Sequence, residues 1–174
     1  MGSEILNVVI RADAGPGVGT GHVMRMLALG QACVRLGGRV TMAVGDVPVG
    51  LVKRIENADI EVRKLVSGRA CQKEAEETAC LAQELAADWI VLDGYAFGNE
   101  YQSELAGQSS LLVMDDGNVD KESPADLVLN QNAFAEVPPW RSPTDYLAGC
   151  QYTCLLYTSP SPRDLSTSRM PSSA

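Results

Sequence analysis

Residues 11–25 read Arg11-Ala-Asp-Ala-Gly-Pro-Gly-Val-Gly-Thr-Gly-His-Val-Met-Arg25. They follow an apolar run at 5–10 that is typical of a buried strand, and they lead into a segment with helical periodicity at about 22–37. Glycine at alternate positions lets the backbone approach a ligand closely, and the first N–H groups of a helix attract anions. His22 is the only histidine in the chain and stands at the start of the expected helix. The stretch therefore predicts a strand, a glycine-rich turn and a helix that begins beside a titratable group.

Two known phosphate-binding loops do not fit this turn. The dinucleotide fingerprint G-x-G-x-x-G fails, because its third glycine falls on Thr20 when counted from Gly15 and on His22 when counted from Gly17. The P-loop requires Gly-Lys-Ser/Thr, and the first lysine of the chain is Lys53. On local sequence alone, a glycine-rich connection whose histidine merely caps a helix remains open.

Short apolar runs alternate with helical patterns along the chain. We expect strands at 5–10, 39–44, about 60–65, 88–92, 110–114 and 126–129, and helices at about 22–37, 48–58, 70–87 and 98–107. Fully apolar strands separated by helices indicate a parallel sheet that is covered on both faces. The chain is therefore expected to form a doubly wound, mostly parallel, Rossmann-like α/β domain with strand order 3-2-1-4-5. The acidic residues of the third helix, Glu74, Glu76, Glu77 and Glu84, are expected on its solvated face.

The carboxyl edge of such a sheet is where ligands bind. Polar residues expected at this edge are Arg11, Asp13, His22, Asp93, Tyr95, Asp115, Asp116, Asn130, Gln131 and Asn132. Asp116, Asn130 and Asn132 are interpreted as caps or turn formers, because Asp and Asn are favoured there. Tyr95 differs from them, since a phenol gains nothing from a capping role.

The composition of the chain argues against several classes of binding partner and site. The formal net charge is −8, and it becomes −9 without the last 21 residues, which hold Arg163, Arg169 and Asp164. An acidic chain without a Lys/Arg run argues against nucleic acid and anionic membrane surfaces as partners. No apolar run reaches the roughly 18 residues of a membrane span, and no signal peptide pattern precedes the first strand. The cysteines lack C-x-x-C spacing, so neither a zinc site nor a disulfide framework is expected, and a cytoplasmic location is predicted.

The motif at 11–25 resembles the N-terminal signature of the UDP-2,4-diacetamido-2,4,6-trideoxy-β-L-altropyranose hydrolases of pseudaminic acid synthesis, some of whose relatives are described as spore-coat polysaccharide proteins. Further blocks follow in the family's order: Ile90-Val-Leu-Asp-Gly-Tyr95, Leu111-Leu-Val-Met-Asp-Asp116, Ala125-Asp-Leu-Val-Leu-Asn-Gln-Asn132 and Tyr146-Leu-Ala-Gly149. The similarity spans residues 5–153. Pro16, inside the glycine turn, departs from the family's pattern.

The resemblance implies two Rossmann-like domains in the glycosyltransferase-B arrangement and cleavage of an anomeric C–O bond by water. It implies that His22 is the general base and that Tyr95 contacts the sugar, with no cofactor and no metal. Expected substrate-binding residues are Arg11, Asp13, Gly19, Gly21, Arg25 and Asp93. Asp13 and Arg25 could orient either the histidine or the sugar. The helix N-terminus is expected to disfavour the imidazolium form of His22 and keep the ring neutral. UDP would be held mainly by the second domain.

The end of the chain resembles something other than a natural protein. From Cys154 it reads Cys-Leu-Leu-Tyr-Thr-Ser-Pro-Ser-Pro-Arg-Asp164, which resembles the conceptual translation of a sequencing adapter, and the match resumes at Ser168. We therefore expect residues 1–153 to be an N-terminal sugar-binding and catalytic domain. Residues 154–174 are expected to be a non-native, disordered tail, and the C-terminal nucleotide-binding domain to be missing. The fragment alone is expected to be inactive.

Two other functions stay open. A glycosyltransferase of the same architecture would use a sugar acceptor in place of water, and the N-terminal domain separates these two poorly. A nucleotide-sugar-binding module without chemistry is the third hypothesis, and His22 within its motif argues against it.

Overall fold

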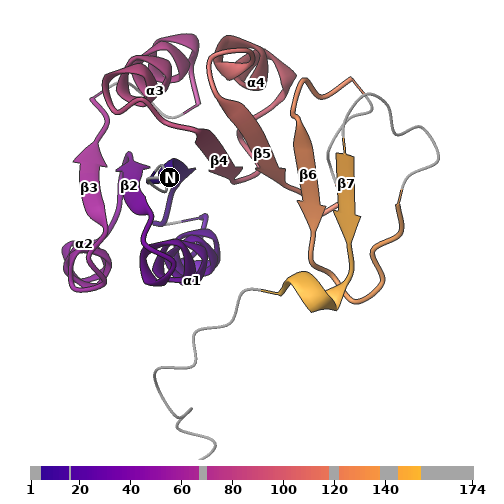
Figure 1. The fold of residues 1–174 in the computed structure, drawn as a ribbon, viewed down its shortest axis with the longest axis horizontal. Helices are drawn as coiled ribbons and strands as arrows, with labels where there is room; N and C mark the ends of the chain where they lie inside the picture. Colours follow the sequence, from indigo (N-terminus) through magenta and orange to yellow (C-terminus); the bar gives the residue numbers. More distant parts are fainter. Residues whose placement is uncertain (1–4, 16, 67–69, 118–121, 138–144, 154–174) are drawn as a thin grey trace, which may run out of the picture.

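Seven strands form one parallel sheet with the order β3-β2-β1-β4-β5-β6-β7 (Figure 1). The computed structural model describes residues 5–15, 17–66, 70–117, 122–137 and 145–153. The strands are β1 (Asn7–Ala12), β2 (Arg39–Val44), β3 (Glu61–Lys64), β4 (Trp89–Asp93), β5 (Ser110–Met114), β6 (Leu127–Asn130) and β7 (Asp145–Ala148). The helices are α1 (Gly21–Arg35), α2 (Val49–Glu56), α3 (Gln72–Glu84) and α4 (Asn99–Leu105), followed by the short 3₁₀ helix η1 (Cys150–Tyr152). The predicted doubly wound, Rossmann-like α/β class is confirmed.

Helices cover both faces of the sheet, with α1 and α2 on one face and α3 and α4 on the other (Figure 1). Successive side chains of a strand point to opposite faces. In β1, Val8 and Ile10 therefore join the core beneath α1 and α2, whereas Val9 joins the core beneath α3 and α4. Ile10 and Val9 are both fully buried. This double burial explains why the strands read as continuous apolar runs.

The predicted elements lie close to the observed ones, with shifts of a few residues at the ends of β1, α3 and α4. One strand was not predicted. β7 has only four residues, lies at the edge of the sheet and has only Tyr146 buried, so its sequence carries almost no apolar run. The expected tail at 154–174 and Pro16 lie outside the described residues. Within the described ranges, none of the helices is both long and apolar enough to span a bilayer.

A buried cluster of charges links β1 to α3 beneath the sheet edge. Arg11 is fully buried, and its guanidinium donates to both carboxylate oxygens of Asp13, each at 2.7 Å. Its Nε donates to Glu74 Oε1 at 2.6 Å, and the Tyr101 hydroxyl donates to the same oxygen at 3.2 Å. The Phe97 ring lies 5.0 Å from the guanidinium carbon. Burial alone would lower the pKa of Arg11, but the hydrogen bonds to Asp13 and Glu74 raise it above the ordinary value.

The prediction that the glutamates of α3 face solvent is wrong for Glu74, which is 1 % exposed. It lies on the buried face of the helix with Ala75 and Thr78, and its carboxylate is the counter-ion of Arg11. A charge is tolerated there because the partner guanidinium and hydrogen bonds replace its lost hydration. The local sequence of α3 does not reveal that Glu74 pairs with Arg11, because the two residues are 63 positions apart in the chain.

Glu74→Ala should therefore destabilise the domain strongly. It leaves the buried Arg11 guanidinium partly unpaired, and breaking a buried ion pair costs about 3–5 kcal/mol. Glu76→Ala, on the exposed face of the same helix, is the matched control and should change the free energy of unfolding by less than about 0.5 kcal/mol. Urea unfolding followed by circular dichroism measures both. Equal effects of the two substitutions would contradict the role assigned to Glu74.

The two central strands bring distant segments together at the carboxyl edge. In the register of the β1–β4 pair, Ala12 lies beside Asp93. The chain then leaves β1 toward α1 on one face and leaves β4 toward α4 on the other (Figure 1). This divergence is the topological switch point, where open α/β sheets bind their ligands.

Candidate functional site

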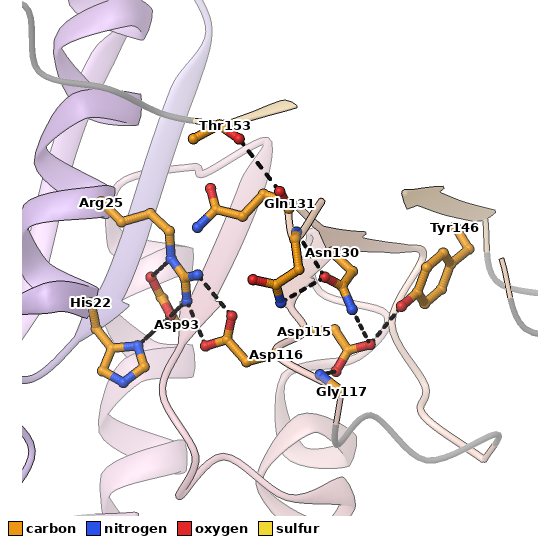
Figure 2. Close-up of polar contacts among 11 residues, drawn as sticks. His22, Arg25, Asp93, Asp115, Asp116, Gly117, Asn130, Gln131, Tyr146 and Thr153 are labelled. Atoms are coloured by element: carbon orange, nitrogen blue, oxygen red, sulfur yellow. Dashed lines mark hydrogen bonds and ion pairs between the residues drawn. The ribbon is translucent and has the colours of Figure 1, made fainter. Parts of the chain in front are cut away.

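A histidine and a buried carboxylate meet at the switch point. His22, in the first turn of α1, has its Nδ1 2.7 Å from Oδ1 of Asp93, the last residue of β4 (Figure 2). Asp93 is fully buried and His22 is 7 % exposed. Because an ionised carboxylate only accepts hydrogen bonds, Nδ1 carries the proton and donates it to Asp93. In the neutral ring, the lone pair is then on Nε2.

Arg25 lies one helical turn after His22 and ties the site to a third element. Its Nε donates to Oδ2 of Asp93 at 2.8 Å, and its Nη1 donates to Oδ1 of Asp116 at 2.9 Å (Figure 2). Asp116 lies in the loop after β5, the neighbour of β4 in the sheet. The cluster of His22, Asp93, Arg25 and Asp116 therefore joins α1, β4 and the loop after β5.

The electrostatics of the cluster favour the protonated histidine. The hydrogen bond to Asp93 raises the pKa of His22 above its ordinary value of 6.5, against the opposing effect of burial and of the Arg25 charge. The expectation that the helix N-terminus keeps His22 neutral is therefore wrong, because the adjacent carboxylate outweighs it. On the other side of the cluster, the hydrogen bond from Arg25 lowers the pKa of Asp116, so this carboxylate stays ionised near neutral pH.

Two pockets have Tyr95 in their lining. The smaller one, of about 250 Å³, is lined by Asp13, Gly17, Val18, His22, Asp93, Gly94, Tyr95, Ala96 and Phe97. The larger one, of about 390 Å³, shares Gly94, Tyr95 and Phe97 and extends over Asn99, Gln102 and the Asp115–Asp116 pair. The Tyr95 ring meets the His22 ring edge-on, with ring centres 4.9 Å apart, and is 73 % exposed. Within the part of the chain that the structure describes, neither pocket is lined by lysine or arginine.

The glycine turn forms the rim of the smaller pocket. Gly17 and Gly19 have φ values of 83° and 76°, which side chains rarely adopt, so the turn itself requires glycine there. A Cβ at Gly17, Gly19 or Gly21 would meet no atom within 4 Å among the described residues. At Gly21, which has an ordinary helical backbone, the absent side chain leaves open space beside the first turn of α1.

The structure places the predicted site residues in different roles. His22 and Tyr95 lie together at the smaller pocket, and Asp13 lines it while binding Arg11 and the Gly45 N–H. Arg11 was predicted to bind substrate. Its side chain is fully buried and its donors point to Asp13 and Glu74, so these ion pairs hold the carboxyl edge of the sheet together from within the core. Asp93 was also predicted to bind substrate, yet both its oxygens are committed to His22 and Arg25.

Asp116 is the site residue that the sequence interpretation missed. It was expected to be a cap or turn former, and it instead forms an ion pair with Arg25. Its place directly after β5, the strand next to β4, is the signal that could have found it. By contrast, Asn130 accepts a hydrogen bond from the N–H of Asn132 at 3.0 Å, which is the turn role expected for both residues.

Asp115 has a structural role on the far side of the same loop. Its carboxylate accepts hydrogen bonds from the Tyr146 hydroxyl at 2.6 Å and from the Gly117 N–H at 2.6 Å (Figure 2). Burial, together with the hydrogen bond to Asp115, raises the pKa of Tyr146 to about 12. This contact connects β7 to the loop that presents Asp116.

Comparisons with known proteins support the fold. No protein-family model matches the chain, and no curated protein matches it in sequence. Among solved structures, the chain is similar to a glycosyltransferase from Rickettsia africae ESF-5, with a TM-score of 0.53 and 13 % identity. The match covers 74 % of this chain and 37 % of that one, so the chain spans well under half the length of that glycosyltransferase. Fold and site together define a Rossmann-like α/β domain with a histidine–carboxylate pair at its switch point.

The raised pKa of His22 predicts a pH-dependent contribution to stability. The folded protein binds the His22 proton more tightly than the unfolded chain does. The stabilisation is therefore fully present below about pH 6.5 and is lost as the pH rises through the pKa of the folded state. Urea unfolding at several pH values should show wild type losing stability in this window by up to about 1.4 kcal/mol per pH unit. His22→Gln should remove this dependence of stability on pH. The account would be contradicted if the free energy of unfolding changed with pH in the same way in both proteins.

Proposed function

We propose that this chain is the N-terminal half of a hydrolase that cleaves a UDP-linked 2,4-diacetamido-2,4,6-trideoxy sugar by attack of water at the anomeric carbon. The observation that carries the proposal is the His22–Asp93 pair at the wall of a pocket beside the glycine turn. The sequence resemblance over residues 5–153 supplies the substrate class. We further propose a cytoplasmic location and a role in pseudaminic acid or related polysaccharide synthesis.

His22 acts as the general base in this proposal. Nε2 takes a proton from water as the water oxygen forms a bond to the anomeric carbon. The bond between that carbon and the phosphate oxygen breaks, and its electron pair leaves with UDP. Asp93 keeps the ring in the tautomer with Nε2 unprotonated and stabilises the imidazolium that forms, as carboxylates do in catalytic triads. The raised pKa makes Nε2 a stronger proton acceptor in those molecules whose His22 ring is neutral.

The charges around the pockets support binding of the sugar rather than of the diphosphate. Aspartates line both pockets, and among the described residues neither lining contains lysine or arginine. A diphosphate would be repelled there, whereas hydroxyl and acetamido groups can pair with Asn99, Tyr95 and backbone groups. We therefore propose that UDP binds mainly to a second, C-terminal domain, in a glycosyltransferase-B arrangement. Residues 1–153 would then supply only the base-bearing wall of the cleft and would be inactive alone.

A glycosyltransferase is the second candidate, favoured by the fold similarity to a glycosyltransferase. The same His22 would then deprotonate a sugar hydroxyl. The two functions differ in the acceptor. A hydrolase releases free sugar and UDP with no added acceptor, whereas a transferase requires one.

The test uses the chain extended by its second domain, with the reaction run in H₂¹⁸O. We expect UDP release without an acceptor and ¹⁸O in the anomeric hydroxyl of the sugar, because water attacks carbon. His22→Ala should slow UDP release by about 10²–10⁴-fold, the range for losing a general base. Tyr95→Phe, which keeps the ring beside His22, should act more mildly. Label in UDP, or a His22→Ala variant with near-normal turnover, would contradict the mechanism.

A further inference from the structure

The ion pair between Arg25 and Asp116 adjoins the His22–Asp93 pair, to which the proposed function assigns the catalysis. The Arg25 guanidinium donates to both oxygens of Asp93, from Nε to Oδ2 and from Nη2 to Oδ1. It also donates to both oxygens of Asp116, from Nη1 at 2.9 Å and from Nη2 at 3.2 Å (Figure 2). Its Nη2 also lies 3.4 Å from His22 Nδ1. The guanidinium is a rigid, planar fork, so these contacts fix its position between the two carboxylates.

The charges of this cluster balance in only one protonation state of His22. Asp93 and Asp116 each contribute −1 and Arg25 contributes +1, which leaves −1 when the His22 ring is neutral. Uptake of a proton by the ring brings the cluster to zero. Among the other groups at this pocket, Asp13 is ion-paired with the buried Arg11. Tyr95 packs its ring against the ring of His22 and forms a hydrogen bond with Asp116.

We propose that Asp116 is a positioning residue of this site: by neutralising Arg25 it reserves the negative charge of Asp93 for the imidazolium of His22. Without Asp116, Arg25 and Asp93 cancel each other and the protonated ring becomes an uncompensated positive charge. The inference rests on the proposed function only in taking His22 as the proton acceptor, so it holds for attack by water or by a sugar hydroxyl.

A purely structural role explains Asp116 less well. Its side chain is 21 % exposed, and partly exposed ion pairs contribute little to stability. Its charge also acts on the buried His22 ring, because a nearby opposite charge favours the protonated form of a histidine. The Arg25 hydrogen bond lowers the pKa of Asp116, which keeps its charge constant while His22 titrates.

The test is an NMR titration of the ring of His22 in the 174-residue chain, prepared without a histidine tag. Because His22 is the only histidine, its ring signals need no assignment. Asp116→Asn should lower the pKa of His22 by about one pH unit, the scale set by one nearby charge. Arg25→Gln removes the opposing positive charge and should raise the pKa. Asp116→Glu, which keeps the charge, should stay close to wild type.

Asp59→Asn is the matched control. It makes the same change in net charge at an exposed position before β3, at the opposite edge of the sheet, and its backbone has a φ of 58°, which asparagine tolerates. It should leave the His22 pKa unchanged. The double variant Arg25→Gln/Asp116→Asn should return the pKa toward the wild-type value, since the two charges are removed together.

A shift for Asp116→Asn no larger than that for Asp59→Asn would overturn the proposal. So would shifts of the same sign for Asp116→Asn and Arg25→Gln, because that result indicates general loosening of the site. Should Asp116→Asn fail to fold, Arg25→Gln decides alone, and a fall or no change in the His22 pKa counts against the proposal. No substrate is present in these titrations, so failure of the proposed hydrolysis would leave their outcome intact.

Discussion

The arrangement of the site depends on the buried carboxylate of Asp93. It has no exposure to water, and its two oxygens bind His22 and Arg25 from successive turns of α1. A buried carboxylate without such partners would be protonated or would unfold the edge, because lost hydration must be replaced. The helix is therefore held against β4 by the same contacts that fix the histidine tautomer. Stability and proposed chemistry share one set of hydrogen bonds.

The fold supplies the rest of this geometry. The parallel β1–β4 register sets Ala12 beside Asp93, and the glycine turn brings α1 back over the edge so that His22 and Arg25 reach the carboxylate. Beneath the edge, Arg11, Asp13 and Glu74 form a second charge cluster that fixes the start of the turn through the Gly45 N–H. On the far side, Asp115 and Tyr146 hold the loop that presents Asp116. The site is thus supported from three sides by buried polar contacts.

Much of this could be predicted from the sequence, because it depends on local patterns. The apolar runs and the glycine turn predict the sheet, its central order and the position of His22 over the carboxyl edge. Pairings between distant residues could not be predicted in the same way. Glu74 was expected in solvent and Asp116 in a turn, since nothing in either local sequence indicates a partner 63 or 91 positions away. β7 was missed because a four-residue edge strand has too few buried side chains to form a pattern.

The central claim is that Asp93 holds His22 with Nε2 available to accept a proton. The ¹⁵N chemical shifts of the His22 ring, recorded above its pKa, report which nitrogen carries the proton. The account predicts a protonated Nδ1 and an unprotonated Nε2 in the neutral ring, and it predicts that this preference disappears in Asp93→Asn, whose amide can also donate. A neutral ring with its proton on Nε2 in the wild-type protein would contradict the account, because the nitrogen facing away from Asp93 could not then act as a base.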